Sequence, residues 1–406
     1  MRALLCVVSA AALLIAGCSG SSQPDAAGAS ETSPTSTPSS ATSTASTTTT
    51  TTSSAPTPIP RGTATITPLR SPPPKENLPA FRAVRIAGAN YPAGLAAAPD
   101  GRVFYSELWG GKIRIIRRDG SVDPKPWADV NALYGIHWEQ FYHGGLTGIA
   151  FDPAFERNHF VYVATQVPDK KTGFATKSLI VRFKERKGRG TSPRILLEIS
   201  ASKFDNTYSL VFGPDGMLYI PSGFLGTNRP GNLRGKVLRV TPDGKAPGDN
   251  PYGKDAPRVW ATGLKNAFDL AFFPGKDFAV AGENGTDAHD EINLLMAGHD
   301  YGYPKHEGFT RSRKVTPPML DYKDDRQAPV GIIYYRGRRY PALRGRFLMC
   351  ENSGNGMIAL RIDRSNPGRL LNMTPIVDEC TLDIVETPDG SVVFSDAGAV
   401  YRLAPA

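Results

Sequence analysis

The stretch that decides the fold is Leu210-Val211-Phe212-Gly213-Pro214-Asp215-Gly216-Met217-Leu218-Tyr219-Ile220. It contains an apolar run, a Pro-Asp-Gly turn and a second apolar run, which is typical of a β-hairpin. The phrase returns at Pro99-Asp100-Gly101 and Pro388-Asp389-Gly390, and looser copies centre on Asp152-Pro153, Pro274-Gly275 and Pro341 to Gly345. One hairpin unit in six copies predicts a repeat architecture.

A further strand-like run follows each hairpin. These runs are Lys112–Ile116, Leu179–Phe183, Lys236–Val240, Glu291–Leu295, Met357–Leu360 and Ala399–Leu403. The spacing leaves room for one four-stranded sheet per repeat, which predicts an all-β, six-bladed β-propeller. Because the last repeat supplies only three strands, we expect Phe81–Ile86 to complete the last blade and close the ring. A pair of β-sandwiches would not explain six evenly punctuated hairpins.

The N-terminus is typical of a targeting segment. In residues 1–17, Arg2 precedes an apolar stretch, Leu4 to Ile15, that is too short to span a membrane as a mature helix. It ends in Ala16-Gly17-Cys18, the pattern of a bacterial lipobox, in which Cys18 is lipidated. The alternative is an ordinary secretory signal with a stray cysteine. The lipobox predicts a lipid-anchored protein of the bacterial cell envelope, facing outside the cytoplasm.

Residues 18–78 consist largely of Ser, Thr, Ala, Pro and Gly, with an unbroken threonine run at 47–52. Such a composition has little apolar surface to bury, so it predicts a disordered tether. Its Ser, Thr and Pro content also suits O-glycosylation. We therefore divide the chain into a signal peptide (1–17), a tether (18–78) and a propeller (79–406).

The charge and the motifs of the chain limit the classes of partner and of catalytic site that we expect. The 47 Lys and Arg residues against 38 Asp and Glu give a net charge of +9, but the cations are scattered, which argues against a nucleic-acid partner. We expect a membrane through the lipid anchor, and a sugar, glycan or envelope protein as ligand. The six histidines have no zinc-motif spacing and no serine lies in a G-x-S-x-G elbow.

Two cysteines remain in the folded part once Cys6 and Cys18 are assigned to the targeting segment. Cys350 and Cys380 form an even pair in an oxidising compartment, which favours a disulfide. The alternative is two buried, unpaired thiols.

Three segments carry a family resemblance. They are His143 to Phe155, Gly263 to Phe272, and Asp290 to Asn293 followed by Asp300 to Pro304. In this order and spacing they resemble the glucose/sorbosone dehydrogenase family, over about residues 80–406. The resemblance implies a six-bladed propeller that oxidises aldose sugars with pyrroloquinoline quinone (PQQ) and calcium.

The resemblance also implies residue roles. Asp205 stands at the position of the family's catalytic base, which is normally a histidine. The positions implied to contact the quinone or its calcium are His143, Lys265, Asn266, Gly285 and Thr286. Glu291, through its carboxylate, and Tyr301, through its backbone carbonyl, match a structural calcium site with the oxygen ligands that this ion prefers. The alternative is that Asp290 and Glu291 only orient a long loop.

The chain departs from the family at several of these positions. Gly223-Phe224 replaces the usual Gly-Asp, Ser353 stands near an expected lysine, and Cys380-Thr381-Leu382 replaces an Arg-x-Arg. Lys265 takes the place of an arginine and loses its two-pronged hydrogen bonding to carboxylates. A Cys350–Cys380 bridge would staple blades five and six where the family holds its cofactor.

Three functions follow from these patterns. The first is a non-catalytic binding protein with a degenerate quinoprotein site, favoured if Trp109, Trp138, Tyr142 and Phe224 cluster on one face. The second is active oxidation of aldose sugars with PQQ and calcium. The third is a calcium-dependent lactonase or other hydrolase, with inward acids among Glu107, Asp205, Glu283, Glu351 and Asp396. In each case we expect the site over the central channel, among the loops that enter the inner strands.

Overall fold

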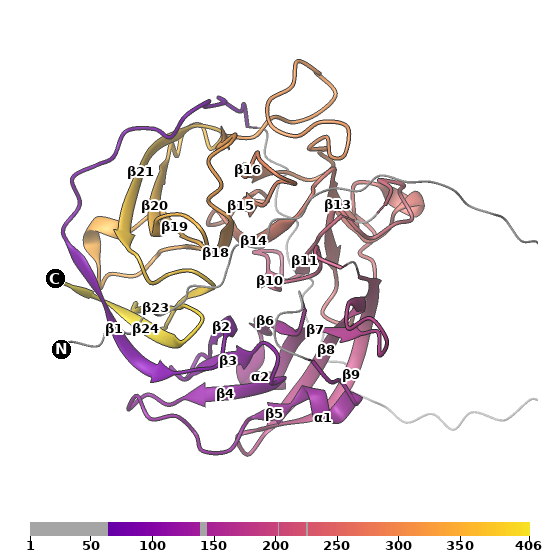
Figure 1. Cartoon of the computed structure of the whole chain (residues 1–406), viewed down its shortest axis with the longest axis vertical. Helices are drawn as coiled ribbons and strands as arrows, with labels where there is room; N and C mark the ends of the chain where they lie inside the picture. The colour runs from indigo at the N-terminus through magenta and orange to yellow at the C-terminus, as the bar shows by residue number, and fades with distance from the viewer. Residues whose placement is uncertain (1–63, 139–143, 202, 225) are drawn as a thin grey trace, which may run out of the picture. The chain divides into compact units, whose positions relative to one another are not determined.

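The computed structural model describes residues 64–138, 144–201, 203–224 and 226–406. In these residues the strands form six four-stranded sheets, each with consecutive neighbours hydrogen-bonded. The sheets are arranged as the blades of a ring (Figure 1). The predicted all-β, six-bladed propeller is confirmed.

The first three blades follow the chain in order. The first contains β2 (Pro92–Ala97), β3 (Val103–Glu107), β4 (Lys112–Ile116) and β5 (Ala128–Asp129). The second contains β6 (Leu146–Phe151), β7 (Phe160–Pro168), β8 (Ala175–Arg186) and β9 (Arg189–Ser200). The third contains β10 (Val211–Phe212), β11 (Leu218–Ser222), β12 (Lys236–Val240) and β13 (Val259–Thr262). Short helices α1 (Val130–Tyr134) and α2 (Phe155–Asn158) lie in connections.

The fourth and fifth blades repeat this order. The fourth contains β14 (Ala267–Phe272), β15 (Ala279–Glu283), β16 (Glu291–Leu295) and β17 (Leu320–Asp321). The fifth contains β18 (Pro329–Tyr334), β19 (Phe347–Glu351), β20 (Gly356–Ile362) and β21 (Leu370–Val377). Single 3-10 turns, η1 (Gly253–Asp255) and η2 (Pro341–Leu343), lie in loops of blades three and five.

The sixth blade closes the ring with both ends of the folded chain. It contains β22 (Ile384–Glu386), β23 (Val392–Ser395), β24 (Ala399–Pro405) and, outermost, β1 (Phe81–Gly88). The strands β1 and β24 pair antiparallel, from Phe81 opposite Pro405 to Gly88 opposite Ala399, and lie side by side in Figure 1. The expected closing strand is therefore present, and it covers an edge that would otherwise be open.

Each Pro-Asp-Gly turn is stabilised by the aspartate side chain and by the backbone conformation of the glycine. In all three clear copies the aspartate accepts a hydrogen bond from the backbone N–H two residues later. The following glycine has a positive φ, of 87° at Gly101, 73° at Gly216 and 77° at Gly390. Such turns suit Asp and Gly for these two reasons.

The ring has two faces, which we call the loop face and the turn face. The loop face carries the loops that enter the inner strands and those between second and third strands, and includes Asp205, Gly223, Lys265 and Gly285. The turn face carries the hairpin turns at the other ends of the strands, including Pro99, Pro214, Lys276, Arg336 and Pro388. Because each blade is an antiparallel meander, these two sets of connections lie at opposite ends of the strands.

A segment that we expected in the tether packs on the propeller. Within residues 64–78, the Thr67 N–H donates to the carbonyl of Gly368 and the Leu69 N–H to that of Met319, each at 2.9 Å. Ile66 and Leu69 pack against the apolar core of blades four and five. This segment therefore belongs to the folded body, so the expected boundary at residue 78 is placed too late.

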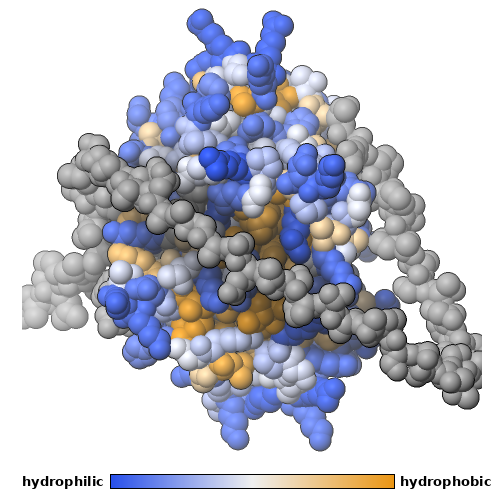
Figure 2. Space-filling view, turned by 90° about the vertical axis from the view of Figure 1, so that its right-hand side faces the viewer, coloured by the Kyte–Doolittle hydropathy of each residue, from blue (hydrophilic) through white to orange (hydrophobic). Residues whose placement is uncertain are grey.

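Figure 2 shows one side of the molecule, where hydrophilic side chains dominate the projecting surface and apolar residues lie in its recessed middle. No helix within the described ranges is long and apolar enough to cross a bilayer.

Candidate functional site

The residue at the family's base position is tied to the residue at a cofactor position. Asp205 Oδ1 lies 3.1 Å from Lys265 Nζ, and the two side chains are 19% and 14% exposed. The Lys265 backbone is held as well: its N–H donates to Glu283 Oε1 at 2.5 Å, and its carbonyl accepts from the Phe224 N–H at 2.6 Å. The structure thus brings Asp205 and Lys265 together as a half-buried ion pair.

Arg234 is a charged residue of this face that the sequence analysis missed. It is fully buried, and its guanidinium donates to the carbonyl oxygens of Gly223, Ser200, Asp205 and Phe224. Burial lowers its pKa to about 10, although the Asp205 charge acts in the opposite direction. Its guanidinium therefore binds the loops of its own chain. Nothing in its sequence context, Asn232-Leu233-Arg234-Gly235, distinguishes it from a surface arginine.

Asn266, Gly285 and Thr286 line the same face. Asn266 is buried, and its Oδ1 has no hydrogen-bond partner among the described residues. The Gly285 N–H donates to Asp290 Oδ1 at 2.9 Å, and the Thr286 N–H donates to Glu307 Oε1 at 2.6 Å. The loop implied to hold the cofactor-linked calcium is thus fixed by two acids. His143 lies outside the described residues.

Blade four carries a row of buried carboxylates. Glu283 pairs across the sheet with Glu291, which pairs with Asp321. Burial raises the pKa of Glu283 to about 7 and that of Glu291 well above its usual range, where the Glu283 charge adds to the effect. Glu291 accepts hydrogen bonds from the Gly308 N–H at 2.7 Å and from Asn293 Nδ2 at 2.9 Å.

Tyr301 lies in the core beside this row. Its hydroxyl donates to the Leu294 carbonyl at 2.6 Å and accepts from the Met296 N–H at 2.9 Å. Across the described ranges no three His, Cys, Asp or Glu side chains converge as a metal-binding group. Oxygen ligands from Glu291 and a Tyr301 carbonyl suit calcium by type, and a calcium ion there stays a prediction.

Aromatic rings gather on the loop face. Tyr91 and Trp109 lie 4.7 Å apart between ring centroids, and Phe224 and Tyr303 lie 4.8 Å apart. All four are partly exposed. Of the other aromatics singled out in the sequence, Trp138 is buried in a small core cluster and Tyr142 lies outside the described residues.

Cys350 and Cys380 are bonded to each other, and both are fully buried. Cys350 lies in β19, and Cys380 lies in the segment between β21 and β22. The bridge therefore links blade five to the start of blade six, as we expected. It lies where the resemblance implies cofactor contacts, so these positions are covalently committed to the fold.

The acids considered for a hydrolase are each engaged by a separate neighbour. Glu107 pairs with Arg114 at 2.9 Å, and Glu351 accepts from the Tyr322 hydroxyl at 2.8 Å. Asp396 accepts from the Tyr401 hydroxyl at 2.8 Å, and Glu283 belongs to the buried row. These contacts give no support to a shared calcium-dependent hydrolase centre.

The central channel holds a cavity of about 780 Å³, which reaches from Tyr208 and Phe268 to the turn prolines Pro214 and Pro388. Tyr208 and Phe268 stack with centroids 4.3 Å apart and planes within 4°. Since they stand at the starts of the inner strands, the stack forms the end of the cavity near the loop face. The cavity extends toward the turn face, away from the face where we expected the site.

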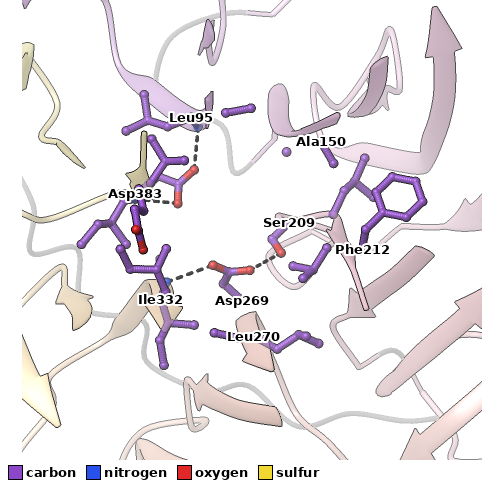
Figure 3. Close-up of a pocket in the computed structure, with 18 of the residues that line it drawn as sticks. Leu95, Ala150, Ser209, Phe212, Asp269, Leu270, Ile332 and Asp383 are labelled. Carbon is purple, nitrogen blue, oxygen red and sulfur yellow. Dashed lines mark hydrogen bonds between the residues drawn. The ribbon is translucent and has the colours of Figure 1, made fainter. Parts of the chain in front are cut away.

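Two carboxylates face this channel (Figure 3). Asp269 accepts from the Ile332 N–H at 2.9 Å and from the Ser209 hydroxyl, and Asp383 accepts from the Leu95 N–H at 2.6 Å. Burial, with the Asp269 charge as a further cause, raises the pKa of Asp383 to about 8. Burial raises the pKa of Asp269 to about 6. Each bond crosses to the next blade, so both acids tie the ring together.

The repeat itself contains the signal for these acids. The residue before each inner apolar run is Gly94, Gly148, Ser209, Asp269, Gly331 or Asp383. At the glycines there is little room for a side chain: a Cβ on Gly331 would lie 2.6 Å from Asp383 Oδ1, and one on Gly94 would lie 1.9 Å from the Thr147 carbonyl oxygen. A repeat-by-repeat comparison would therefore have marked Asp269 and Asp383 as the acidic members of the channel lining.

An acidic quinone needs cations that are not already engaged. Among the described residues at the family's cofactor positions, Lys265 is the cationic one. Its ammonium group faces the carboxylate of Asp205. The guanidinium of Arg234 is enclosed by backbone carbonyls, and Ser353 and Cys380 are neutral. The charges that this face offers in the described residues do not fit an acidic quinone, and we derive no redox step through one.

The chain is similar to known proteins in both sequence and structure. Residues 89–402 match the sequence profile of a family described as Glucose / Sorbosone dehydrogenase. An uncharacterised protein of Synechocystis is 30% identical over 374 residues, which cover 80% of this chain and 87% of that protein. The PQQ-bound aldose sugar dehydrogenase of Streptomyces coelicolor shares the fold, with a TM-score of 0.67 and 23% identity, covering 82% of this chain and 99% of that one.

A relative with a different kind of name also matches. Human hedgehog-interacting protein is 23% identical over 308 residues, which cover 66% of this chain and 42% of that protein. Relatives of this chain therefore carry names of enzymes and of an interacting protein.

Proposed function

Because the chain belongs to the glucose/sorbosone dehydrogenase family, we propose that it keeps the propeller of this family as a binding protein of the cell envelope. Its ligand is a glycan held on the loop face, and its quinone site is degenerate. The observation that carries the proposal is the ion pair between Asp205 and Lys265 at 3.1 Å. It joins the residue at the base position to the cation at the cofactor position, so neither is ready for its family role.

The energetics of this pair support the same view. Abstraction of a hydroxyl proton needs a base whose pKa lies near the working pH, and an ordinary carboxylate is a weak base. The Lys265 ammonium already engages Asp205 Oδ1 at 3.1 Å, so a hydroxyl proton would have to compete with this cation for the carboxylate. The neighbouring arginine, Arg234, is held by four carbonyls and would have to leave them to bind a cofactor.

The loop face offers a glycan the groups that sugars use. The partly exposed rings of the Tyr91–Trp109 and Phe224–Tyr303 pairs provide flat apolar surfaces. The hydroxyls of Thr286 and Tyr303, which lie 3.1 Å apart on the exposed surface, supply polar groups beside one of these pairs. Aromatic surfaces with a few polar groups are typical of small-ligand sites.

Intrinsic tryptophan fluorescence provides the binding test, since Trp109 is partly exposed whereas the other three tryptophans are buried. A panel of neutral oligosaccharides is titrated into the full chain, and we expect a saturable change in emission. Tyr303→Ala should weaken the binding about tenfold, since loss of an aromatic contact costs on the order of 1 kcal/mol or more. Ile195→Ala, an exposed apolar residue of β9, is the control and should bind normally.

Reconstitution provides the redox test. The full chain is incubated with calcium and PQQ, and dye reduction is followed with aldose sugars. The proposal predicts no cofactor-dependent absorption change and no turnover. A bound-quinone spectrum together with sugar-dependent dye reduction would replace it with the second candidate, an active aldose dehydrogenase. That candidate is favoured by one observation, the carboxylate of Asp205 at the base position.

The location of the protein is part of the proposal. The lipobox ending at Cys18, which lies outside the described residues, predicts a lipid anchor in the cell envelope. Cys18→Ala should move the protein from the membrane fraction to the soluble extracytoplasmic fraction. An unchanged distribution would show that the anchor is not Cys18.

A further inference from the structure

A pocket of about 480 Å³ opens on the turn face between blades four and five. Its lining includes four cationic side chains from three separate segments, Lys276, Arg336, Arg344 and Arg364. All four residues are exposed. This pocket is separate from the loop-face site and is formed by the opposite ends of the strands.

The lining of the pocket contains no Asp or Glu among the described residues. Within the same ranges none of the four cations forms a salt bridge closer than 4.0 Å. Two acids close to the pocket do not line it. Asp363 accepts from Ser365 and Asn366, and Glu386 accepts the Arg336 backbone N–H at 2.8 Å and interacts with the charge of its guanidinium. The guanidinium groups of Arg344 and Arg364 have no such acidic partner within the described residues and are thus left for a ligand.

A second pocket on the turn face provides an internal comparison. It lies between blades six and one, has a volume of about 550 Å³, and contains Arg117, Arg118 and Arg402. Its lining also contains three acids, Asp100, Asp119 and Asp389. The two pockets are lined by corresponding turns of two different pairs of blades, but of these two pockets only the one at blades four and five has a surplus of positive charge.

The arginine-rich loop 335–346 of this pocket is held in one shape by buried tyrosines. The Tyr335 hydroxyl donates to the Gly390 carbonyl at 2.8 Å and accepts from the Tyr340 N–H at 3.1 Å. The Gly345 N–H donates to the Tyr335 carbonyl at 2.9 Å. Because the loop is already ordered, binding a ligand costs less conformational entropy.

Gly345 lets Arg364 approach this loop. Its φ is 79°, and a Cβ at this position would lie 2.1 Å from Arg364 Nη2. A side chain here would therefore displace the guanidinium from the pocket. The close approach places cations from two different turns around one space.

Guanidinium groups bind phosphate through paired hydrogen bonds, which suits a site with three arginines. The remaining lining includes the apolar groups of Phe273, Pro274, Tyr334 and Pro367, and the volume suits one or two rings. We propose that this pocket binds a sugar that carries a phosphate group. The large apolar residues that are exposed in the described ranges, Leu133 and Ile195, lie in α1 and β9, so the pocket has no apolar rim for entering a membrane.

Calorimetric titration of the full chain with glucose 6-phosphate, glucose and inorganic phosphate tests the proposal. We expect the phosphosugar to bind more tightly than inorganic phosphate, and glucose to give no signal that depends on this pocket. Arg344→Ser with Arg364→Ser should weaken glucose 6-phosphate about a hundredfold, at about tenfold for each charged hydrogen-bonding group. Both side chains are exposed, so the variant should fold, which circular dichroism checks.

Arg117→Ser with Arg118→Ser is the matched control, since it removes the same charge from the pocket that contains acids. It should change the affinity for glucose 6-phosphate less than about twofold. Equal losses in the two variants would indicate a general charge effect and overturn the proposal. It would also be overturned if no probe bound at millimolar concentration, or if the pocket variant lost binding only to phosphatidylglycerol vesicles.

Discussion

The loop face and the turn face of this propeller use their charges in opposite ways. On the loop face, Lys265 is paired with Asp205, and Arg234 is enclosed by the carbonyls of its own loops. On the turn face, Arg344 and Arg364 line a pocket without an acid. The same residue types therefore stabilise the fold at one end of the strands and remain available to a ligand at the other. A charged side chain is therefore available to a ligand only where no acid or carbonyl oxygen of its own chain already binds it.

Arg234→Met should produce the largest effect. It would remove the shared donor of buried carbonyl oxygens on two loops, so we expect the free energy of unfolding to fall by about 4 kcal/mol. Urea denaturation followed by tryptophan fluorescence measures it, with Arg344→Met as the exposed control. If both variants unfolded at the same urea concentration, the contrast between the faces would be lost.

Removal of the disulfide should be next. Cys350 and Cys380 are separated by 30 residues, and closing a loop of this size stabilises a fold by about 3 kcal/mol. The double change to alanine suits the buried site and should lower the thermal midpoint. Reductant should lower the midpoint of the parent chain but leave that of the variant unchanged. If neither the double substitution nor the reductant changed the thermal midpoint, the disulfide would not contribute to stability.

Between the two faces, Asp383 should make stability depend on pH. Its pKa is raised from 3.8 to about 8, so the folded chain keeps a proton that the unfolded chain releases. Stability should therefore fall as pH rises from about 4 to 8, with a slope approaching about 1.4 kcal/mol per pH unit. Asp383→Asn should flatten this slope in denaturation series, whereas Asp100→Asn on a turn should not. An unchanged slope would argue against a protonated Asp383.

The Asp205–Lys265 pair should have a smaller effect. It is partly exposed, so a double-mutant cycle with Asp205→Asn and Lys265→Gln should give a coupling of about 1 kcal/mol. The coupling should shrink at high salt. A value near zero would mean that the two charges do not hold each other, and it would remove the main support for a degenerate site.

The smallest effect belongs to the turn face. Arg344→Ser with Arg364→Ser should change unfolding free energy by less than about 0.5 kcal/mol, since neither side chain forms a salt bridge within the described residues. The same urea series measures it. A clear loss of stability would show that these arginines serve the fold, as Arg234 does.

The architecture could be predicted because it is local and repeated. Each Pro-Asp-Gly turn uses the same aspartate and glycine geometry, and the strands Lys112–Ile116, Lys236–Val240 and Glu291–Leu295 have the bounds that we expected. The packing of residues 64–78 could not be predicted, because Ile66 and Leu69 are isolated apolar residues in a polar segment. Their burial depends on blades that lie far along the chain.

The site was less predictable for a related reason. Counting from the turns located Asp205 and Lys265, but it could not show that they contact each other, since they belong to different blades. Arg234 carries no pattern, because the carbonyls that surround it come from the backbone. Asp269 and Asp383 had a signal in the repeat, but it appears only when all six repeats are compared position by position.

The closure of the ring has a consequence for biogenesis. Phe81 at the start of β1 pairs with Pro405 at the end of β24, so the first strand of the fold cannot pair until the sixth blade is available. Until then the nascent chain exposes an unpaired strand and an incomplete blade, a form that invites aggregation. Because β1 and β24 cover each other, damage to either strand would reopen this edge of the ring.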